Sequence, residues 1–251
     1  MWVPVDTPSE MYGIDANGKK WGKLYNFGST SYSPYNWTET DGKISITRRT
    51  ERREPDIVSE YDYSTYLSAV NTILETNYTT SADFKTDLEI DFSNMINSVE
   101  KYKGFYVGRY ETSLNANGIA QSKQGETSSN ASDTDTNMWY GLYARQKLYS
   151  TDSVQGSMIW GSQYYAIMKW MQSNGIDVTS ATPTDLSIGI TSKNTTRVTG
   201  GANDGQTVSK DKLSNIYDLL GNSYEWSIEA NSSRNRVFLG GITRAIMNLV
   251  I

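Results

Sequence analysis

The chain contains no cysteine and no histidine among its 251 residues. Without thiolate or imidazole it lacks cysteine and histidine nucleophile relays, a Ser-His-Asp triad and the ordinary zinc ligands. The absence of cysteine is compatible with a protein of the cell surface and equally with a cytosolic one. What remains is carboxylate, hydroxyl, amine and aromatic chemistry, and this set favours recognition over catalysis.

Basic surface and long apolar runs are also scarce. The formal net charge is −5 and the isoelectric point is near 4.9, which argues against nucleic acid as a partner. The run Arg48–Arg53 contains an acidic residue and is followed by Glu54-Pro55. We interpret it as a solvated charged loop or edge, with a phosphate site as the alternative.

No apolar run approaches the ~20 residues that a membrane span requires, and no charged and then apolar leader follows Met1. We therefore expect no membrane span in this chain. The opening Met1–Pro4 is also compatible with a chain cut after a leader or an anchor.

Aromatic and small polar residues are abundant. The chain has 18 tyrosines and 7 tryptophans beside many serine, threonine, asparagine and glycine residues, a mixture that binding surfaces favour. Its length suits one large domain. We predict a single domain over residues 1–251, with strands and two helices in 1–103 and a motif-bearing core in 104–251.

Apolar residues recur at helical spacing in three places. The spacing predicts one helix over Tyr66–Leu74 behind a Ser64 cap and another over Phe84–Val99 behind Ser81. A third helix is predicted over Tyr164–Met171, with Asn174-Gly175 at its C-terminal end.

Turn signals dominate residues 1–60, so we expect short strands or ordered loops there. Gly104–Thr112 is predicted to be a strand. The polar stretches Ser113–Asn137 and Thr179–Lys210 are predicted to be long exposed loops, because they offer almost no apolar residue to a core.

Two segments carry a resemblance to a known family. Asn215–Trp226 contains Asp-Leu-Leu-Gly-Asn followed by Glu-Trp, and Val237–Gly241 ends in Gly-Gly. Upstream, Gly104–Ser113 reads Gly-Phe-Tyr-Val-Gly-Arg-Tyr-Glu-Thr-Ser. These motifs, in this order, resemble those of the formylglycine-generating-enzyme (sulfatase-modifying-factor) family.

The resemblance implies an α+β, C-type-lectin-like fold with a small twisted antiparallel sheet, helices and long loops. The enzymes of that family use a cysteine pair, and their ergothioneine-pathway relatives use histidines to hold iron, so this chain lacks both chemistries. It is therefore similar to the non-catalytic branch, which includes the variable proteins of diversity-generating retroelements in bacteria and phages. Those proteins display interchangeable residues, many derived from asparagine codons, on a fixed scaffold.

In relatives with this turn a structural calcium ion is held by side-chain and backbone oxygens. The resemblance implies a Ca²⁺ site here, and calcium prefers six to eight oxygen ligands. Its ligands would be the side chains of Asp218 and Glu225 and the carbonyls of Gly221 and Ser223. The alternative is a metal-free turn in which Asp218 is a cap and Glu225 a buried, hydrogen-bonded carboxylate.

A paired-carboxylate hydrolase site built from Asp218, Glu225 and Glu229 is the third possibility, because carboxyl groups ~5 to 9.5 Å apart suffice for glycoside hydrolysis. The resemblance gives no precedent for it, and we expect no enzyme activity. Trp226 and Trp160 are predicted to be core residues.

The hydrophilic segment Glu229–Arg236 is predicted to connect the motif to the next strand and to lie on the open, ligand-binding face. Trp139 and Tyr140 flank a polar loop, where contact with a ligand and packing in the core are about equally expected. The predicted ligand-binding residues are Asn222, Tyr224, Ser227, Glu229, Asn231, Ser232, Ser233, Asn235, Trp139 and Tyr140.

The pattern departs from the family at its end. Relatives continue past Gly-Gly to a final closing strand, whereas this sequence ends at Ile251. Either Ala245–Ile251 supplies a shortened substitute strand, or the fold is truncated, in which case an open sheet edge would favour self-association.

These observations predict a ligand-binding protein of receptor or adhesin type on a bacterial surface or phage particle, with a protein or glycan as ligand. The alternative is a structural assembly module, resembling a pilin or a phage-tail component, without a saturable ligand.

Overall fold

The computed structural model describes residues 1–25, 37–46, 54–55, 64–126 and 139–175, and toward the end 212–213, 215–217, 219, 225–231 and 235–239. Within them the helices are η1 (Pro8–Met11, 3-10), α1 (Ser64–Leu74), α2 (Ser81–Tyr102), α3 (Trp139–Lys147) and α4 (Gly161–Ser173). The strands are β1 (Trp2–Pro4), β2 (Tyr12–Ile14), β3 (Lys20–Gly22), β4 (Trp37–Thr40), β5 (Lys43–Ile46), β6 (Gly104–Tyr106), β7 (Thr112–Leu114), β8 (Ala120–Ser122), β9 (Lys212–Leu213), β10 (Ile216–Tyr217), β11 (Glu225–Asn231) and β12 (Asn235–Leu239).

The long helix α2 is the central element, and its sequence specifies both of its ends. The Thr80 hydroxyl accepts the N–H of Asp83, and the Asp83 carboxylate accepts the N–H of Thr80 at 3.0 Å, which is a capping box. At the other end Lys103 adopts a left-handed conformation with φ 60° and donates its N–H to Val99. The cap is thus Thr80, one residue before the predicted Ser81.

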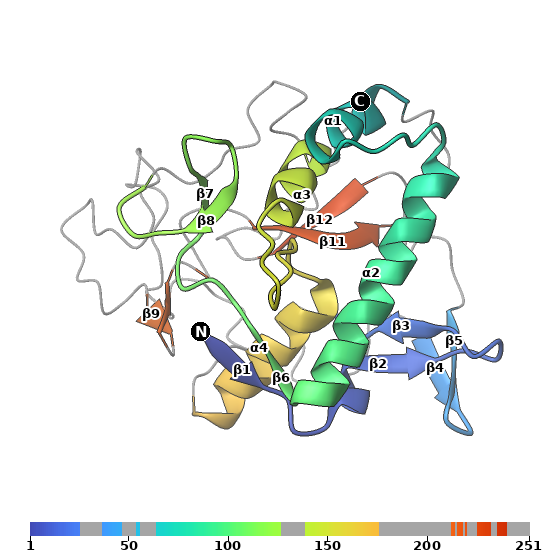
Figure 1. Cartoon of the computed structure of the whole chain (residues 1–251). Helices are drawn as coiled ribbons and strands as arrows, with labels where there is room; N and C mark the ends of the chain where they lie inside the picture. The colour runs from blue at the N-terminus through green and yellow to red at the C-terminus, as the bar shows by residue number, and fades with distance from the viewer. Residues whose placement is uncertain are drawn as a thin grey trace.

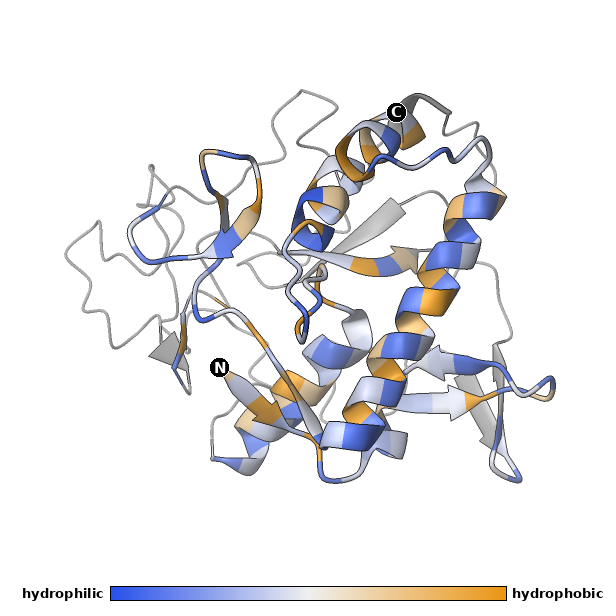
Figure 2. Ribbon diagram, in the orientation of Figure 1, coloured by the Kyte–Doolittle hydropathy of each residue, from blue (hydrophilic) through white to orange (hydrophobic). Residues whose placement is uncertain are grey.

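Helix α2 buries a stripe of apolar side chains, and Figure 2 shows orange and blue residues alternating around it. The stripe packs with α1, α3 and β11 in one core cluster, where Phe84 meets the ring of Tyr143 edge-on at 5.3 Å. The buried residues of the stripe are Phe84, Leu88, Phe92, Ile96 and Val99.

A second core cluster surrounds α4. Ile167 and Met168 of that helix are fully buried against Val3 of β1 and Ile216 of β10. Phe105 of β6 packs against both clusters and so joins them.

The strands form small antiparallel sheets, each of two strands among the described residues: β1–β6, β2–β3, β4–β5, β7–β8, β9–β10 and β11–β12. The pair β1–β6 joins the start of the chain to its middle, with Trp2 opposite Tyr106. In Figure 1 the hairpins β2–β3 and β4–β5 lie on one side of the molecule, and β7–β8 and β9 lie on the other. In the described residues, four α-helices with small antiparallel sheets make this a mixed α+β protein, as the sequence predicts.

The helices predicted over Tyr66–Leu74, Phe84–Val99 and Tyr164–Met171 are confirmed by α1, α2 and α4. Trp160 is buried, as predicted, and Trp226 is half-buried against the core around α2. The predicted strands of residues 1–60 are present as β1 to β5.

Three predictions of local structure were wrong. Gly104–Thr112 is not one strand, because β6 ends at Tyr106 and β7 begins at Thr112. The predicted loop Ser113–Asn137 includes the hairpin β7–β8, and Ser113 is buried. Residues 127–137 of this predicted loop lie outside the described residues. The predicted connection Glu229–Arg236 lies largely in the hairpin β11–β12.

Segments 176–211 and 240–251 lie outside the described residues, so the predicted loop Thr179–Lys210 and the closing segment Ala245–Ile251 stay predictions. The charged run Arg48–Arg53 lies outside them as well. Within the part of the chain that is described, no helix is long and apolar enough to cross a membrane.

Candidate binding cavity

A cavity of about 260 Å³ opens where β6, α3, α4, β10 and β11 come together. Its floor is apolar, with buried Leu142, Met158, Ile216 and Leu219. The other lining residues are Phe105, Tyr106, Val107, Gly108, Tyr110, Glu111, Thr112, Gln146, Gln155, Ser157, Ile159, Gln163, Tyr217 and Trp226.

Backbone hydrogen bonds between distant segments fix the cavity walls. Tyr217 of β10 donates its N–H to the carbonyl of Arg109 at 2.7 Å, and Ile228 of β11 donates to Ile159 at 3.0 Å. The second bond connects β11 to the segment that leads into α4. Each of these two bonds therefore joins cavity segments that lie more than 60 positions apart in the sequence.

One side of the cavity is aromatic. The rings of Tyr110 and Tyr217 stack with centroids 4.9 Å apart and an interplanar angle of 29°. The guanidinium of Arg109 lies 5.6 Å from the first ring centroid and 5.8 Å from the second, within cation–π range. The Arg109 Nε also donates to the carbonyl of Asn215 at 3.4 Å, so this stack holds β10 against the segment after β6.

Another part of the lining carries neutral polar groups from α3, from α4 and from the segment between them. Gln146 of α3 and Gln163 of α4 are half-buried, and Gln155 and Ser157 are exposed at the rim. Gln155 donates from Nε2 to the carbonyl of Lys147 at 3.2 Å, which anchors the rim to the end of α3. Such amides orient a ligand through hydrogen bonds without adding charge.

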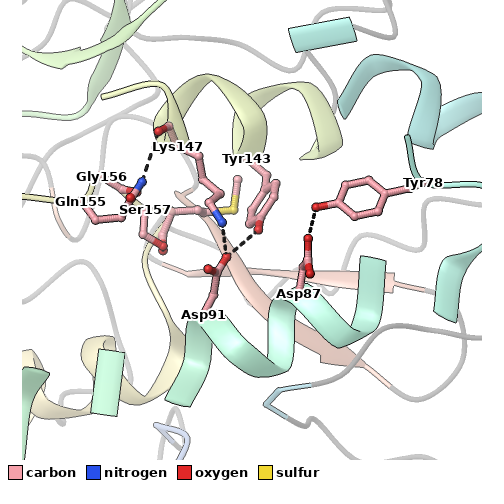
Figure 3. A network of polar contacts seen from close by, with 9 residues as sticks. Tyr78, Asp87, Asp91, Tyr143, Lys147, Gln155, Gly156 and Ser157 are labelled. Carbon is pink, nitrogen blue, oxygen red and sulfur yellow. Dashed lines mark hydrogen bonds and ion pairs between the residues drawn. The ribbon is translucent and has the colours of Figure 1, made fainter. Parts of the chain in front are cut away.

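A polar network, drawn in Figure 3, holds α3 on α2. Gln146 belongs to the same helix α3. The carboxylate of Asp91 on α2 accepts hydrogen bonds from the Tyr143 hydroxyl at 2.8 Å and from the Lys147 ammonium. One turn earlier, Asp87 accepts the hydroxyl of Tyr78. Burial raises the pKa of both tyrosine hydroxyls, with the aspartates adding to the rise, so they stay protonated donors.

Two carboxyl groups lie buried at the N-terminus of α4. Glu54 is fully buried and accepts the backbone N–H groups of Gly161 and Ser162 and the Ser162 hydroxyl. Glu229 of β11, also fully buried, approaches the same place, because a Cβ atom added to Gly161 would lie 2.6 Å from its Oε2 and 3.1 Å from Oε2 of Glu54.

This pair changes the ionisation of Glu54. Burial raises the pKa of Glu54 to about 8; the hydrogen bonds from Ser162 and Gly161 oppose the rise, and the charge of Glu229 adds to it. Because both side chains lack exposure to solvent, we assign them a structural role at the helix terminus. Sequence reasoning missed Glu54, since it follows a charged run that was interpreted as solvated.

The structure places part of the predicted ligand-binding set inside the protein. Trp139 and Ser227 are buried and bonded to each other, with the indole N–H donating to the Ser227 carbonyl at 2.8 Å. Glu229 is buried, and Tyr140 is half-buried against Phe84. These four side chains support β11 and α3 from within and do not line the cavity.

Asn231 pairs with Asn235 in the strand register at the end of the β11–β12 hairpin. Asn222, Tyr224, Ser232 and Ser233 lie outside the described residues.

Of the predicted calcium ligands, Asp218, Gly221 and Ser223 lie outside the described residues, and Glu225 begins β11 opposite Leu239. No group of three acidic side chains that could hold a metal ion occurs in the described part of the chain. The calcium site stays a prediction, and no function of the cavity depends on it.

Comparisons with protein-family models, curated proteins and solved structures found no match to this chain. The structure by itself defines the class, an α+β protein with a lined cavity. Any more specific statement about the fold subtype or the function rests on the residues of this chain alone.

Proposed function

We propose that the protein is a non-catalytic, ligand-binding protein of receptor or adhesin type, and that the cavity beside α3 and α4 holds its ligand. The observation that carries the proposal is the lining. It combines an apolar floor with aromatic rings and a few converging amide and hydroxyl groups, which is the composition of small-molecule and ligand sites.

The two segments that carry the family resemblance both contribute to this lining. Phe105 to Thr112 come from the Gly104–Ser113 motif, and Ile216, Tyr217, Leu219 and Trp226 come from the Asn215–Trp226 motif. This supports a C-type-lectin-like scaffold of the formylglycine-generating-enzyme subtype. In this proposal the signature residues form the binding cavity.

The proposal keeps a second contact surface at the β11–β12 hairpin, where Asn231 pairs with Asn235 in the strand register and retroelement diversification would act. The protein would act outside the cell, on a bacterial surface or phage particle, with a glycan or protein ligand. A Ca²⁺ ion held by the Asp218–Glu225 turn would stiffen the segment that leads into β11.

The proposal is tested by screening the purified protein against a glycan array and a peptide array, and by measuring each hit for saturable binding. The variant Ser157→Trp fills the cavity rim, and Ser153→Trp, in the same exposed segment but outside the lining, is its matched control. We expect binding to be lost in the first variant and kept in the second.

Mass spectrometry of the recovered ligand should show it chemically unchanged, whereas a turnover product would identify an enzyme. If neither array gives a saturable ligand and the protein self-associates in sedimentation experiments, the assembly-module alternative replaces this proposal.

A further inference from the structure

The lining of the cavity also indicates the chemical class of the ligand. We infer that the cavity binds a neutral saccharide, an inference that rests on the ligand-binding function proposed above. Three features carry it: amide and hydroxyl groups, chiefly of Gln146 and Thr112, that form no side-chain hydrogen bond with the described residues, aromatic rings at the mouth, and a lining that offers no cation among those residues.

The side-chain amide of Gln146 is the central polar group. It is half-buried in the cavity wall, and it makes no hydrogen bond to any other residue that the structure describes. An amide offers one acceptor oxygen and two N–H donors, whereas each sugar hydroxyl both donates and accepts. Two adjacent hydroxyls of a sugar ring can therefore both hydrogen-bond to this amide, one donating to its oxygen and the other accepting from its N–H.

Two further groups complete the polar side. The hydroxyl of Thr112 on β7 is half-buried in the lining and, like Gln146, makes no side-chain hydrogen bond within the described residues. Gln163 uses its Oε1 to accept the N–H of Trp160 at 3.1 Å, which leaves its N–H groups for a ligand. Half-buried polar groups of this kind require water or ligand partners.

Trp2 and Tyr106 form an aromatic rim at the mouth. The Tyr106 side chain lines the cavity and is 75% exposed, and the Trp2 ring meets it edge-on with centroids 5.0 Å apart at 64°. The Trp2 ring lies tightly over Gly104, where an added Cβ atom would come within 2.3 Å of it. The Trp2 ring is therefore held in place, and the two rings can pack against the apolar C–H face of a sugar ring.

Charge argues against an acidic ligand. Among the described lining residues Glu111 is the one charged side chain, and the net charge of the protein is −5. A phosphate or carboxylate in this cavity would find no lysine or arginine among the described lining residues, and the nearby guanidinium of Arg109 already lies over the rings of Tyr110 and Tyr217. A neutral hydroxylated ligand requires no such cation.

Size favours a small ligand or the terminal unit of a longer one. The volume of about 260 Å³ lies just below the ~300–1,000 Å³ usual for small-molecule sites. It suits one sugar ring seated in the cavity, with the next ring resting on the aromatic rim.

The test is saturation-transfer NMR of the whole chain with glucose, galactose, mannose, N-acetylglucosamine and their common disaccharides, in parallel with an array of neutral and charged peptides. Gln146→Leu keeps the side-chain size and removes the amide, and Gln172→Leu on α4, outside the lining, is its matched control. We expect one or more neutral saccharides to bind, with affinity reduced about tenfold or more in Gln146→Leu and unchanged in Gln172→Leu.

Thr112→Val removes a hydroxyl at nearly constant volume and is the second cavity variant, used if Gln146→Leu fails to fold by circular dichroism; Tyr106→Ala should weaken binding of disaccharides more than of monosaccharides. Saccharide binding that neither cavity variant weakens would refute the site. Binding of peptides alone would refute the neutral-saccharide class and leave the proposed ligand-binding function standing. Absence of binding in the saccharide panel and in the peptide array would refute both the saccharide inference and the proposed ligand-binding function.

Discussion

At the scale of single residues, the burial of Glu54 is not predicted by the residues next to it in the sequence. A carboxylate that follows a charged run is ordinarily solvated, yet Glu54 is fully buried and receives three hydrogen bonds from the first residues of α4. Nothing within Arg48–Pro55 indicates this, because the donors lie more than 100 positions away in the sequence. Only the folded chain brings the partners together.

This burial predicts a pH dependence of stability. The pKa of Glu54 is near 4.5 in the unfolded chain and about 8 in the folded protein. Below the unfolded value both states hold the proton, so its contribution is fully present; as pH rises toward 8 the unfolded chain releases the proton first. The free energy of unfolding should therefore fall across this range, by an amount on the order of a few kcal/mol.

The measurement is urea denaturation of wild type and Glu54→Gln from about pH 5 to 8, with the exposed Glu75→Gln as control. Glu54→Gln should flatten the slope, and Glu75→Gln should leave it unchanged. A wild-type slope that Glu54→Gln does not alter would contradict the assignment.

At the scale of elements, turn chemistry explains both a success and a failure of sequence reasoning. The hairpins β2–β3 and β7–β8 share one turn, written Asp15-Ala-Asn-Gly18 in the first and Asn115-Ala-Asn-Gly118 in the second. In each the first side chain accepts two backbone N–H groups across the turn, and the glycine takes a positive φ, 83° and 72°. The second turn was overlooked because it sits within a polar stretch.

The turn of β7–β8 gives a prediction at this scale. Asn115→Ala removes the acceptor of the N–H groups of Asn117 and Ile119, which lie 2.9 and 3.0 Å from it. The hairpin should lose about 1 kcal/mol of local stability. Amide hydrogen exchange at Ile119 should be correspondingly faster, and Asn117→Ala, an exposed neighbour, should not change it.

The contact between α2 and α3 gives a second prediction at the scale of elements. Asp91 accepts hydrogen bonds from Tyr143 and Lys147, so Asp91→Ala leaves a largely buried hydroxyl and an ammonium without their acceptor. We expect a loss of about 1–3 kcal/mol in the free energy of unfolding. Asn94→Ala on the exposed side of the same helix is the control, and equal losses in both variants would mean that the network contributes nothing.

At the scale of the whole molecule, the two core clusters share Phe105, and the walls of the cavity come from both. This coupling predicts one cooperative unfolding transition, consistent with a single domain over 1–251. Phe105→Ala should lower the free energy of unfolding by about 3 kcal/mol and keep the transition single. Calorimetry checks both, and two separate transitions in wild type would contradict the single-domain prediction.

The sequence by itself predicted the helices α1, α2 and α4, because apolar spacing acts within a few residues, and its resemblance to a known family implied the α+β class. The excluded chemistries also follow from composition alone. The helix α3 was not predicted, since its start at Trp139 carries aromatic residues on several sides, and partners of theirs such as Phe84 and Ser227 lie far away in the sequence.

The tertiary structure decided the site. It placed Trp139, Ser227 and Glu229 inside and left Gln146, Thr112 and Tyr106 on the cavity, since which face of a strand or helix is covered depends on elements far away in the sequence. Short-range patterns fix where elements form. Long-range packing fixes which of their side chains remain for a ligand.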